Sequence, residues 1–536
     1  MSSLLFKHGP IWTADPSRPR AEAVLTEGDR ILRIGGEAEL EKLATAETRI
    51  IDLDGALLIP GFIDCHTHFL KGGYALSRIQ LRDVTSREAF AERIAAKVAE
   101  LEKGSWILDG HWDHERFSPP GLPDRSWIDR VSPDHPVCVH RYDLHSALLN
   151  SLALRTSGIT KDTVAPDGGE IEKDPRTGEP TGILRDAALD LVAPHIPRPS
   201  RKAAWAAAEA ALRHAARLGV TSVHDMSDAA SLAVYRELFG AGRLTARISV
   251  YRPITEMDAF DPAKVRVPVD NGMIRVAGMK GFADGGVGSH SAYFFEPYAD
   301  NPNTSGYPSR EMFPEGIMEE RVLKADRAGL QVTVHAIGDR ANALVCDIYG
   351  RVLERNGKRD RRWRIEHVQH VRPGELTRIA ALGVIPSVQP YHAVAEADWV
   401  EKRVGKERAR MTYAFRSLLD GGGRLAFGSD WPVVPLNPLL GIHAAVTRQT
   451  EDGKNPRGWH PDQRIPLEAA LLAFTRNGAR AEFMEDEKGS IEPGKLADLV
   501  VLDRDIFAAA PERIKDARAV LTVVGGRVVH EARTLS

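Results

Sequence analysis

The sequence predicts an α/β protein: a TIM (β/α)8 barrel, a small composite β-sandwich domain formed by both termini, and an insertion after the first barrel strand. Three observations support this prediction. Short runs rich in β-branched residues alternate with helix-length segments through most of the chain. Both ends of the chain are rich in strand-like segments. Between residues 75 and 200, the alternation gives way to short strands and irregular loops.

The alternating region contains eight predicted strands, the number that a (β/α)8 barrel requires. A doubly wound open sheet is the competing fold, but no glycine-rich phosphate loop follows any of these strands. We therefore assign residues 58–74 and 201–484 to the barrel. The strands lie at 57–66, 220–226, 246–254, 273–285, 330–339, 361–370, 383–390 and 424–432, with helical segments at 314–329, 340–357, 373–383 and 407–423.

The two strand-rich ends have too few strands to form stable cores separately. Segments such as "EAVLTEGDRILRIGG" near the start and "AVLTVVGGRVVHE" near the end share the same composition. We therefore expect residues 1–57 and 485–536 to form one domain. Residues 75–200 are too many for a simple loop, and we expect them to cover the side of the barrel where active sites form.

The composition is that of a soluble globular protein, with 43% hydrophobic and 27% charged residues among 536. The formal charge is −3 and there is no long basic block, which argues against nucleic acid as a partner. No segment approaches the roughly 18 apolar residues that span a bilayer. Three widely separated cysteines suit a reducing compartment. We predict a cytoplasmic protein without membrane attachment that acts on a small molecule, and the composition is compatible with a homo-oligomer.

Side chains of the metal-ligand type recur where the predicted barrel strands end. His66 and His68 close the first strand, and residues two apart on an extended strand point to the same face. An isolated His-x-His pair also occurs at ordinary strand-to-loop junctions. Imidazole and carboxylate are ligands of borderline cations such as Zn²⁺, so the full set predicts a metal site at one barrel mouth. The later strands end at Lys280, His335, His367 or His370, and Asp430.

Five ordered motifs resemble a known family: "PGFIDCHTHF", "MKGFADGGVGSHSA", "VHAIGDRA", "RIEHVQH" and "FGSDWPV". They are similar to motifs of the amidohydrolase superfamily and, within it, of the amidohydrolase 3 (YtcJ-like) group, which includes N-substituted formamide deformylases. Parts of the insertion and the C-terminal "GSIEPGKLADLVVLD" resemble the same group. The resemblance therefore covers nearly the whole chain.

This resemblance implies a binuclear metal centre with two Zn²⁺ ions. His66 and His68 would bind the more buried ion, and His335 and His367 the more exposed one. Lys280 would bridge both ions as a CO2-derived carbamate, and Asp430 would bind metal and move protons. Taken alone, Lys280 would instead be interpreted as a solvated lysine, because an ammonium group cannot ligate a cation.

Three other polar residues at strand ends, His370, His224 and Asp225, remain to be assigned. His367 and His370 are three apart and face opposite sides of an extended strand. His367 directly follows "RIE", as the family ligand does, so we choose it as the ligand. His370 is then a partner of a ligand or a loop histidine. His224 and Asp225 match no family ligand, and we expect them to form a hydrogen-bonded pair in the core.

The implied reaction is hydrolysis of an amide-like C–N bond, in an N-acyl or N-formyl amine, by metal-bound hydroxide with Asp430 as the catalytic acid–base. Cyclic amides, carbamates and esters are alternative substrates. A mononuclear deaminase is the nearest alternative enzyme, but Gly338 stands where its glutamate would follow His335 by three residues. A non-catalytic binding protein is the alternative from another class, and the presence of every expected ligand type argues against it.

Five further residues are candidates for the substrate pocket. Asp284 and His290 follow the fourth-strand lysine closely, and turn roles are equally compatible with their positions. Trp112, His145 and Trp431 carry rings of the kind that line small-molecule sites, with ordinary packing as the alternative.

Overall fold

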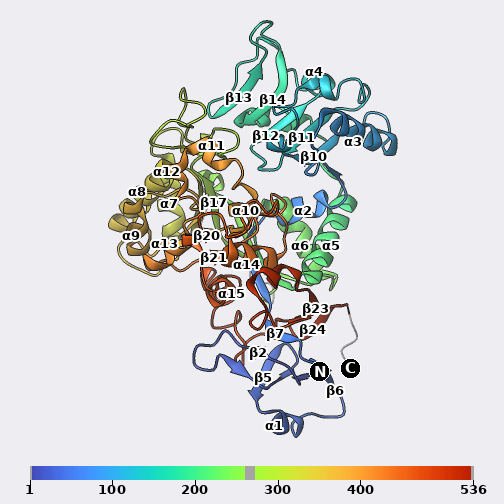
Figure 1. Ribbon diagram of the computed structural model, residues 1–536, viewed down its shortest axis with the longest axis vertical. Coiled ribbons are helices and arrows are strands. Elements are labelled where there is room, and N and C mark those ends of the chain that lie inside the picture. The colour runs from blue at the N-terminus through green and yellow to red at the C-terminus, as the bar shows by residue number, and fades with distance from the viewer. Residues whose placement is uncertain (1–2, 260–271, 533–536) are drawn as a thin grey trace.

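A barrel of eight parallel strands forms the centre of the molecule in the computed structural model, which describes residues 3–259 and 272–532 (Figure 1). Its strands are β8 (Phe62–Thr67), β15 (Val220–Met226), β16 (Arg247–Pro253), β17 (Ile274–Phe282), β18 (Gln331–Ala336), β19 (Arg364–His367), β20 (Ile385–Val388) and β21 (Ala426–Phe427). They lie in the order β21-β20-β19-β18-β17-β16-β15-β8. Beyond β21, Thr67 and Trp431 form a parallel bridge, and the Asp430 N–H donates to the His66 carbonyl at 2.7 Å. These contacts close the barrel and confirm the predicted fold class.

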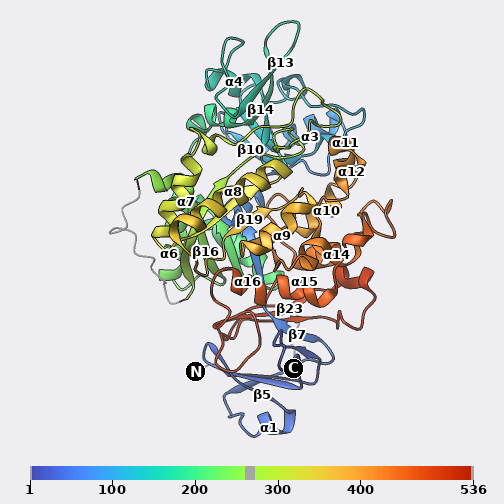
Figure 2. The ribbon, with the colours of Figure 1, turned by 90° about the vertical axis from the view of Figure 1, so that its left-hand side faces the viewer.

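Helices cover the outside of the barrel, as Figures 1 and 2 show. The alanine-rich α5 (Arg201–Arg217) buries small side chains that let α2 (Phe69–Ala75) approach closely. A Cβ atom at Gly73 would lie 2.2 Å from the Ala207 carbonyl oxygen, so only glycine fits there. Within the described ranges, every helix is too short or too polar to span a bilayer. The remaining large helices are α6 (Ala229–Gly240), α7 (Ile317–Arg327), α8 (Asp339–Asn356), α9 (Pro373–Ala381), α14 (Pro438–Thr447) and α15 (Leu467–Ala473).

Two sheets form the lower part of Figure 1, where the two termini also lie, and the second of them combines strands from both ends of the chain. The first contains β1 (Ser3–Lys7), β4 (Ala23–Glu27), β5 (Arg30–Gly35) and β6 (Thr48–Asp52), in the order β5-β4-β1-β6. The second contains β2 (Ile11–Trp12), β3 (Arg20–Ala21), β7 (Leu57–Pro60), β22 (Leu499–Leu502), β23 (Ala519–Val524) and β24 (Arg527–Glu531), in the order β24-β23-β22-β7-β2-β3. One buried apolar cluster draws on both sheets, including Phe6, Ile31, Leu58, Leu499 and Leu521.

The segment predicted as the first barrel strand is two strands in the structure. β7 pairs antiparallel with β22 in the terminal sheet, and β8 belongs to the barrel. Gly61 separates them, and a Cβ atom there would lie 2.3 Å from the Thr221 side chain. β7 therefore lies in the terminal sheet, although the predicted bounds begin the barrel at residue 58, and the domain bounds stay predictions.

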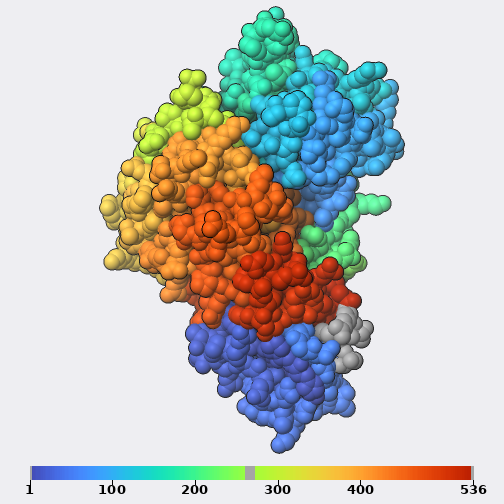
Figure 3. All heavy atoms as spheres, in the orientation of Figure 1, coloured from blue at the N-terminus to red at the C-terminus, as the bar shows by residue number. Residues whose placement is uncertain are grey.

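The insertion lies at the opposite end of the molecule from the terminal sheets (Figures 1 and 3). Its six-stranded sheet has the order β13-β14-β12-β11-β10-β9, and apolar clusters of its own lie on the sheet. Arg403 of the barrel pairs with Glu115 of the insertion at 2.5 Å, which anchors the insertion over the barrel mouth. The elements are β9 (Ile79–Gln80), α3 (Arg87–Glu100), β10 (Ile107–Trp112), β11 (Val137–Arg141), β12 (Ser146–Leu149), α4 (Ser151–Thr156), β13 (Gly169–Lys173) and β14 (Pro180–Asp186).

The helix predicted over residues 407–423 is interrupted in the structure. α12 (Lys406–Ala409) and α13 (Phe415–Asp420) flank a non-helical turn. Tyr413 has a left-handed φ of 52°, and its backbone N–H donates to the Gln369 carbonyl at 2.7 Å. Burial of Tyr413 against Gln369 and Glu396 therefore overrides the local helical tendency.

Candidate metal centre

A cavity of about 170 Å³ lies at the mouth of the barrel, at the carboxyl ends of its strands. The predicted ligands in its wall come from barrel strand ends or the loops after them, where a (β/α)8 barrel places its active site. The structure brings all the sequence-predicted ligand candidates to this cavity. They are His66, His68, Lys280, His335, His367 and Asp430.

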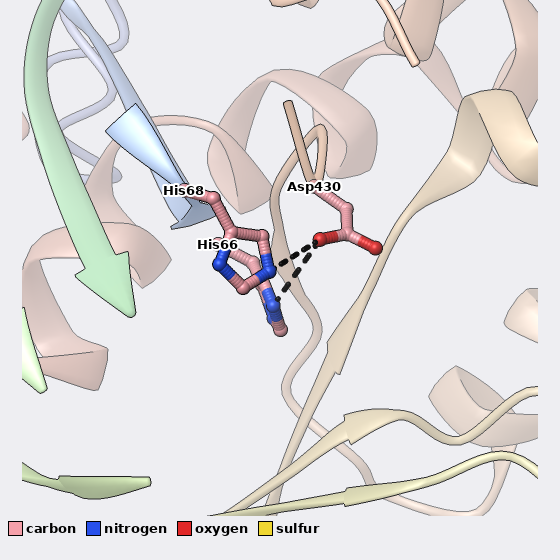
Figure 4. A group of neighbouring side chains, drawn as sticks. All are labelled: His66, His68 and Asp430. Carbon is pink, nitrogen blue, oxygen red and sulfur yellow. Dashed lines mark ion pairs between the residues drawn. The ribbon is translucent and has the colours of Figure 1, made fainter. Parts of the chain in front are cut away.

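Asp430 is the centre of two groups of side chains that could each hold a metal ion. In the first, shown in Figure 4, its Oδ1 atom lies 3.4 Å from His66 Nε2 and 3.3 Å from His68 Nε2. In the second, Asp430 lies with His367 and His392, and all ligand atoms lie within 4.8 Å of one another. One carboxylate is thus close to two candidate ion positions.

A buried glutamate determines how His66 points. Glu366 lies in β19, two residues after Arg364. The Oε2 atom of Glu366 accepts a hydrogen bond from His66 Nδ1 at 2.5 Å. Because Nδ1 carries the proton, the lone pair of Nε2 faces Asp430. Thr333 and Arg364 bind the other carboxylate oxygen of Glu366. Burial opposes its ionisation, but Arg364 and His66 hold the pKa of Glu366 far below its usual range.

Several polar atoms in the cavity wall are buried without a hydrogen-bond partner among the residues that the structure describes. They include Lys280 Nζ, His367 Nδ1, His392 Nε2 and Asp430 Oδ1. Each unsatisfied group of this kind costs about 1–3 kcal/mol. Burial also lowers the pKa of His335 and His367 well below the usual range, so both imidazoles keep a lone pair. A divalent cation would satisfy the imidazole and carboxylate atoms of this set together, and these residues fit such an ion.

Lys280 is unusual for a lysine because only 4% of its surface is exposed. Its Nζ atom lies 4.7 Å from the centre of the Phe282 ring. Burial lowers the pKa of Lys280 to about 8, although Glu366 and Asp430 act in the opposite direction. A neutral amine, the form that reacts with CO2, is therefore accessible near neutral pH.

The backbone at two of these residues is strained. Asp430 and His367 adopt left-handed φ values of 61° and 76°, which cost roughly 1–3 kcal/mol for a residue with a side chain. Asp64 stabilises the loop before Asp430 by accepting the Ser429 N–H at 3.0 Å. Such strain persists where the surrounding structure determines a functional geometry.

Replacing Glu366 with glutamine is expected to weaken metal binding by about 10–100-fold, because His66 would lose the acceptor that sets its tautomer. Competition with a chelator of known affinity measures this loss. Glu354→Gln, on the exposed face of α8, is the matched control and should leave metal affinity unchanged. Equal affinity of the Glu366 variant and the native protein would rule out the orienting role.

Three of the predicted pocket residues lie at or beside the cavity. His145 lines it, with its ring centre 5.4 Å from that of His335. Asp284 accepts the backbone N–H groups of Ile337 and Gly338, so its carboxylate mainly holds the loop after β18. Trp431 lines a larger cleft that adjoins the cavity.

Trp112 and His290 lie elsewhere, contrary to the prediction. Trp112 is in the apolar core of the insertion, where its indole N–H donates to the Val139 carbonyl at 2.7 Å. His290 pairs with Asp300 at 3.1 Å and lines a separate pocket beside Arg403. Each ring is thus used in packing or pairing away from the metal cavity.

His370 points away from the cavity, and the two residues expected to form a core pair bind other partners. His370 Nδ1 lies 2.8 Å from the Thr412 hydroxyl, and its ring packs on Phe294. His224 lies 3.2 Å from Glu482, and Asp225 accepts a hydrogen bond from the Tyr235 hydroxyl at 2.7 Å. His224 and Asp225 are both buried, but they are neighbours on a strand and face opposite sides of it.

His392 is a candidate ligand that was not predicted from the sequence, and it lies in α10 (Pro390–Ala395) directly after β20. Its Nε2 atom is 4.0 Å from Asp430 Oδ2. The signal was present, since "QPYH" places a histidine just beyond the seventh barrel strand. Glu366 was not predicted either, because a glutamate inside a strand has no spacing signature of its own.

Comparisons with known proteins agree with this geometry. Residues 49–530 match the model of the Amidohydrolase family. The chain is 38% identical to protein LONG AFTER FAR-RED 3 of Arabidopsis thaliana, over 99% of this chain and 92% of that protein. It is 31% identical to the YtcJ protein of Bacillus subtilis (strain 168), over 98% of both chains.

An N-substituted formamide deformylase of Arthrobacter pascens is 27% identical, over 99% of both chains. Among solved structures, an uncharacterized metal-dependent hydrolase from Pyrococcus furiosus superposes with a TM-score of 0.73 at 30% identity, covering 95% of this chain and 100% of that one. The chain therefore belongs to the amidohydrolase family, in its YtcJ-like group.

Proposed function

We propose that this protein hydrolyses an amide-like C–N bond in a small N-acyl or N-formyl amine, with two divalent metal ions of the Zn²⁺ type. The single observation that carries the proposal is the pair of ligand groups that share Asp430, with buried donor and acceptor atoms left unpaired around them. The deformylase named among the relatives supports the choice of bond.

His66 and His68 would hold one ion and His335 and His367 the other, with Asp430 shared between them. Lys280 would bridge the ions after its neutral amine adds to CO2 and loses a proton, which produces a carbamate whose two oxygens share one negative charge. His392 is a further candidate ligand beside His367. When bound, the metal ions would polarise the scissile carbonyl and lower the pKa of water.

Asp430 would move the proton. Its carboxylate can accept a proton from the attacking water and return it to the departing nitrogen. Burial acts against ionisation, but His66, His68 and His367 hold the pKa of Asp430 well below its usual range. It is therefore ionised and able to accept a proton when a substrate arrives.

His145 would position the substrate from the insertion side of the cavity. Its Nδ1 atom is bound to Asp186 at 2.7 Å, and Asp186 also accepts the Tyr307 hydroxyl at 3.0 Å. Burial opposes protonation, but Asp186 raises the pKa of His145 to about 9. With Nδ1 engaged, Nε2–H remains to donate to a polar substrate atom.

A mononuclear deaminase is disfavoured by the loop after β18. A Cβ atom at Gly338 would lie 2.0 Å from the Tyr293 carbonyl oxygen, so the backbone leaves no room for a glutamate there.

The buried, unpaired Cys65, Cys138 and Cys346 support the proposed cytoplasmic location.

A substrate panel tests the proposed function. Metal-loaded protein is incubated with N-formyl and N-acetyl amines, a cyclic amide, a carbamate and an ester. We expect release of a free amine and a carboxylic acid from the N-acyl amines, with no ammonia, and loss of activity after chelation. Release of ammonia would favour a deaminase, and no turnover of any compound by fully metallated protein would overturn the proposal.

A further inference from the structure

A second and larger cleft adjoins the metal cavity. It has a volume of about 1070 Å³ and lies between the insertion and the barrel, while the metal cavity holds only about 170 Å³. Val433 lines both spaces, and Trp431, next to Asp430 in the chain, lines the cleft. A small acyl group therefore fits the metal cavity, and the larger amine portion of a substrate fits the cleft.

His111 is held in the cleft wall under strain. Its ring is buried, and neither Nδ1 nor Nε2 has a hydrogen-bond partner within the described part of the chain. Asp109, Gly110 and His111 have consecutive positive φ values of 72°, 93° and 56°, at an irregularity in the pairing of β10. Both the unpaired ring nitrogens and the left-handed backbone cost stability.

Arg82 is the second unsatisfied donor in this wall. Its guanidinium carbon lies 3.6 Å from the centre of the Tyr142 ring, which holds the group in place. Its Nη1 atom is buried without a hydrogen-bond partner in residues 3–259 and 272–532. The Tyr142 hydroxyl donates to Glu396, which lines the metal cavity, so Arg82 lies near the junction of the two spaces.

The carboxylates in the cleft wall, by contrast, already have partners. Glu115 pairs with Arg403 at 2.5 Å, and Asp113 lies 3.6 Å from Arg141. At the other rim, Asp452 pairs with Lys454 at 2.7 Å and Asp398 with the same lysine at 3.6 Å. Glu451 accepts the hydroxyl of Tyr391. Among the described residues of the cleft wall, the buried donors left unpaired are the Arg82 guanidinium, the His111 imidazole and the Trp399 indole N–H, which together suit an anion.

We propose that Arg82 and His111 bind a carboxylate on the amine portion of the substrate. This inference rests on the proposed function and narrows it to N-formyl or N-acetyl amino acids and similar acidic N-acyl amines. The planar guanidinium can donate two hydrogen bonds to one carboxylate, and an imidazole N–H can donate a third.

The test compares N-formylphenylalanine, as either enantiomer, with its carboxamide, which differs only at the carboxylate. We expect the native enzyme to prefer the acid by about 10- to 100-fold in kcat/KM, the range for a hydrogen bond to a charged group. Arg82→Gln should abolish this preference through KM, while the carboxamide stays within about twofold of the native value. His111→Gln should act in the same direction with a smaller effect.

Two further variants separate binding from folding. Arg87→Gln makes the same charge change at an exposed arginine bound to Ser126, away from the cleft, and should leave the preference intact. Arg82→Lys keeps the charge but loses the planar fork, so it should retain part of the preference, which a misfolded variant would not. Equal kcat/KM for the acid and the carboxamide in the native enzyme would overturn the proposal.

Equilibrium binding distinguishes this proposal from the proposed function. Calorimetry with 3-phenylpropionate and 3-phenylpropionamide on metal-loaded protein needs no turnover. Tighter binding of the acid that Arg82→Gln removes, with no hydrolysis of any compound, would support the anion site and reject the amidase. Hydrolysis of N-acyl amines, together with binding of 3-phenylpropionate that Arg82→Gln leaves unchanged, would support the amidase and reject the anion site.

Discussion

Replacing Asp430 with asparagine is expected to lower kcat by at least about 10²–10⁴-fold, the usual contribution of general acid–base catalysis. Asparagine has nearly the same shape and keeps one oxygen that can face a metal ion, but it cannot accept a proton. The effect on kcat should therefore exceed the effect on metal content. Steady-state kinetics and elemental analysis of the same sample measure both.

Metal content must be matched, because an empty site would mimic a catalytic defect. Asp420→Asn is the control, since that carboxylate pairs with Arg416 on the surface of α13. It should leave both kcat and metal content unchanged. Near-normal kcat in the fully metallated Asp430 variant would show that another group transfers the proton.

Replacing Lys280 with glutamine is expected to reduce the metal content from two ions per chain to one. Glutamine is similar in length, but its amide cannot add CO2 and form an anionic bridge. Polarisation by a second ion is worth several kcal/mol, so kcat/KM should fall by about 10²-fold or more. Elemental analysis and a ¹³C spectrum of native protein reconstituted with labelled bicarbonate measure the two effects.

Lys324→Gln on the exposed face of α7 is the matched control for this change. It should keep the native metal content and the native rate. A native protein that shows no carbamate carbon signal and reconstitutes fully without CO2 would reject the bridge. Two ions bound by the Lys280 variant would reject it independently.

The barrel could be predicted because its rules are local. Alternation along β8 directs His66 and His68 to one face, and parallel strands bring their carboxyl ends to one mouth. The meeting of Lys280, His335 and Asp430 in one cavity follows from the same two rules. Their roles as ligands and proton carrier stay predictions.

Other features depend on contacts that no local pattern contains. Trp112 carries an aromatic ring of the kind that lines substrate pockets, but in the structure this ring packs in the apolar core of the insertion. The break between α12 and α13 depends on Gln369 and Glu396, which hold Tyr413 from other segments of the chain. The division of one apolar run into β7 and β8 depends on β22, at the far end of the chain. Long-range pairing of this kind is not visible in a window of sequence.

The pairing of β7 with β22 also affects how the molecule is made. Leu57 faces Leu502, more than 440 residues later in the chain. At roughly 5–20 residues per second, a ribosome needs on the order of 20–90 s to deliver the partner strand. During that time the edge of β7 that later pairs with β22 is unpaired, while β8, one residue further on, and the residue that follows it already carry His66 and His68 of the cavity. The nascent chain must therefore avoid aggregation through this edge until β22 has been synthesised, and chaperones that shield exposed strand edges are expected to raise its yield.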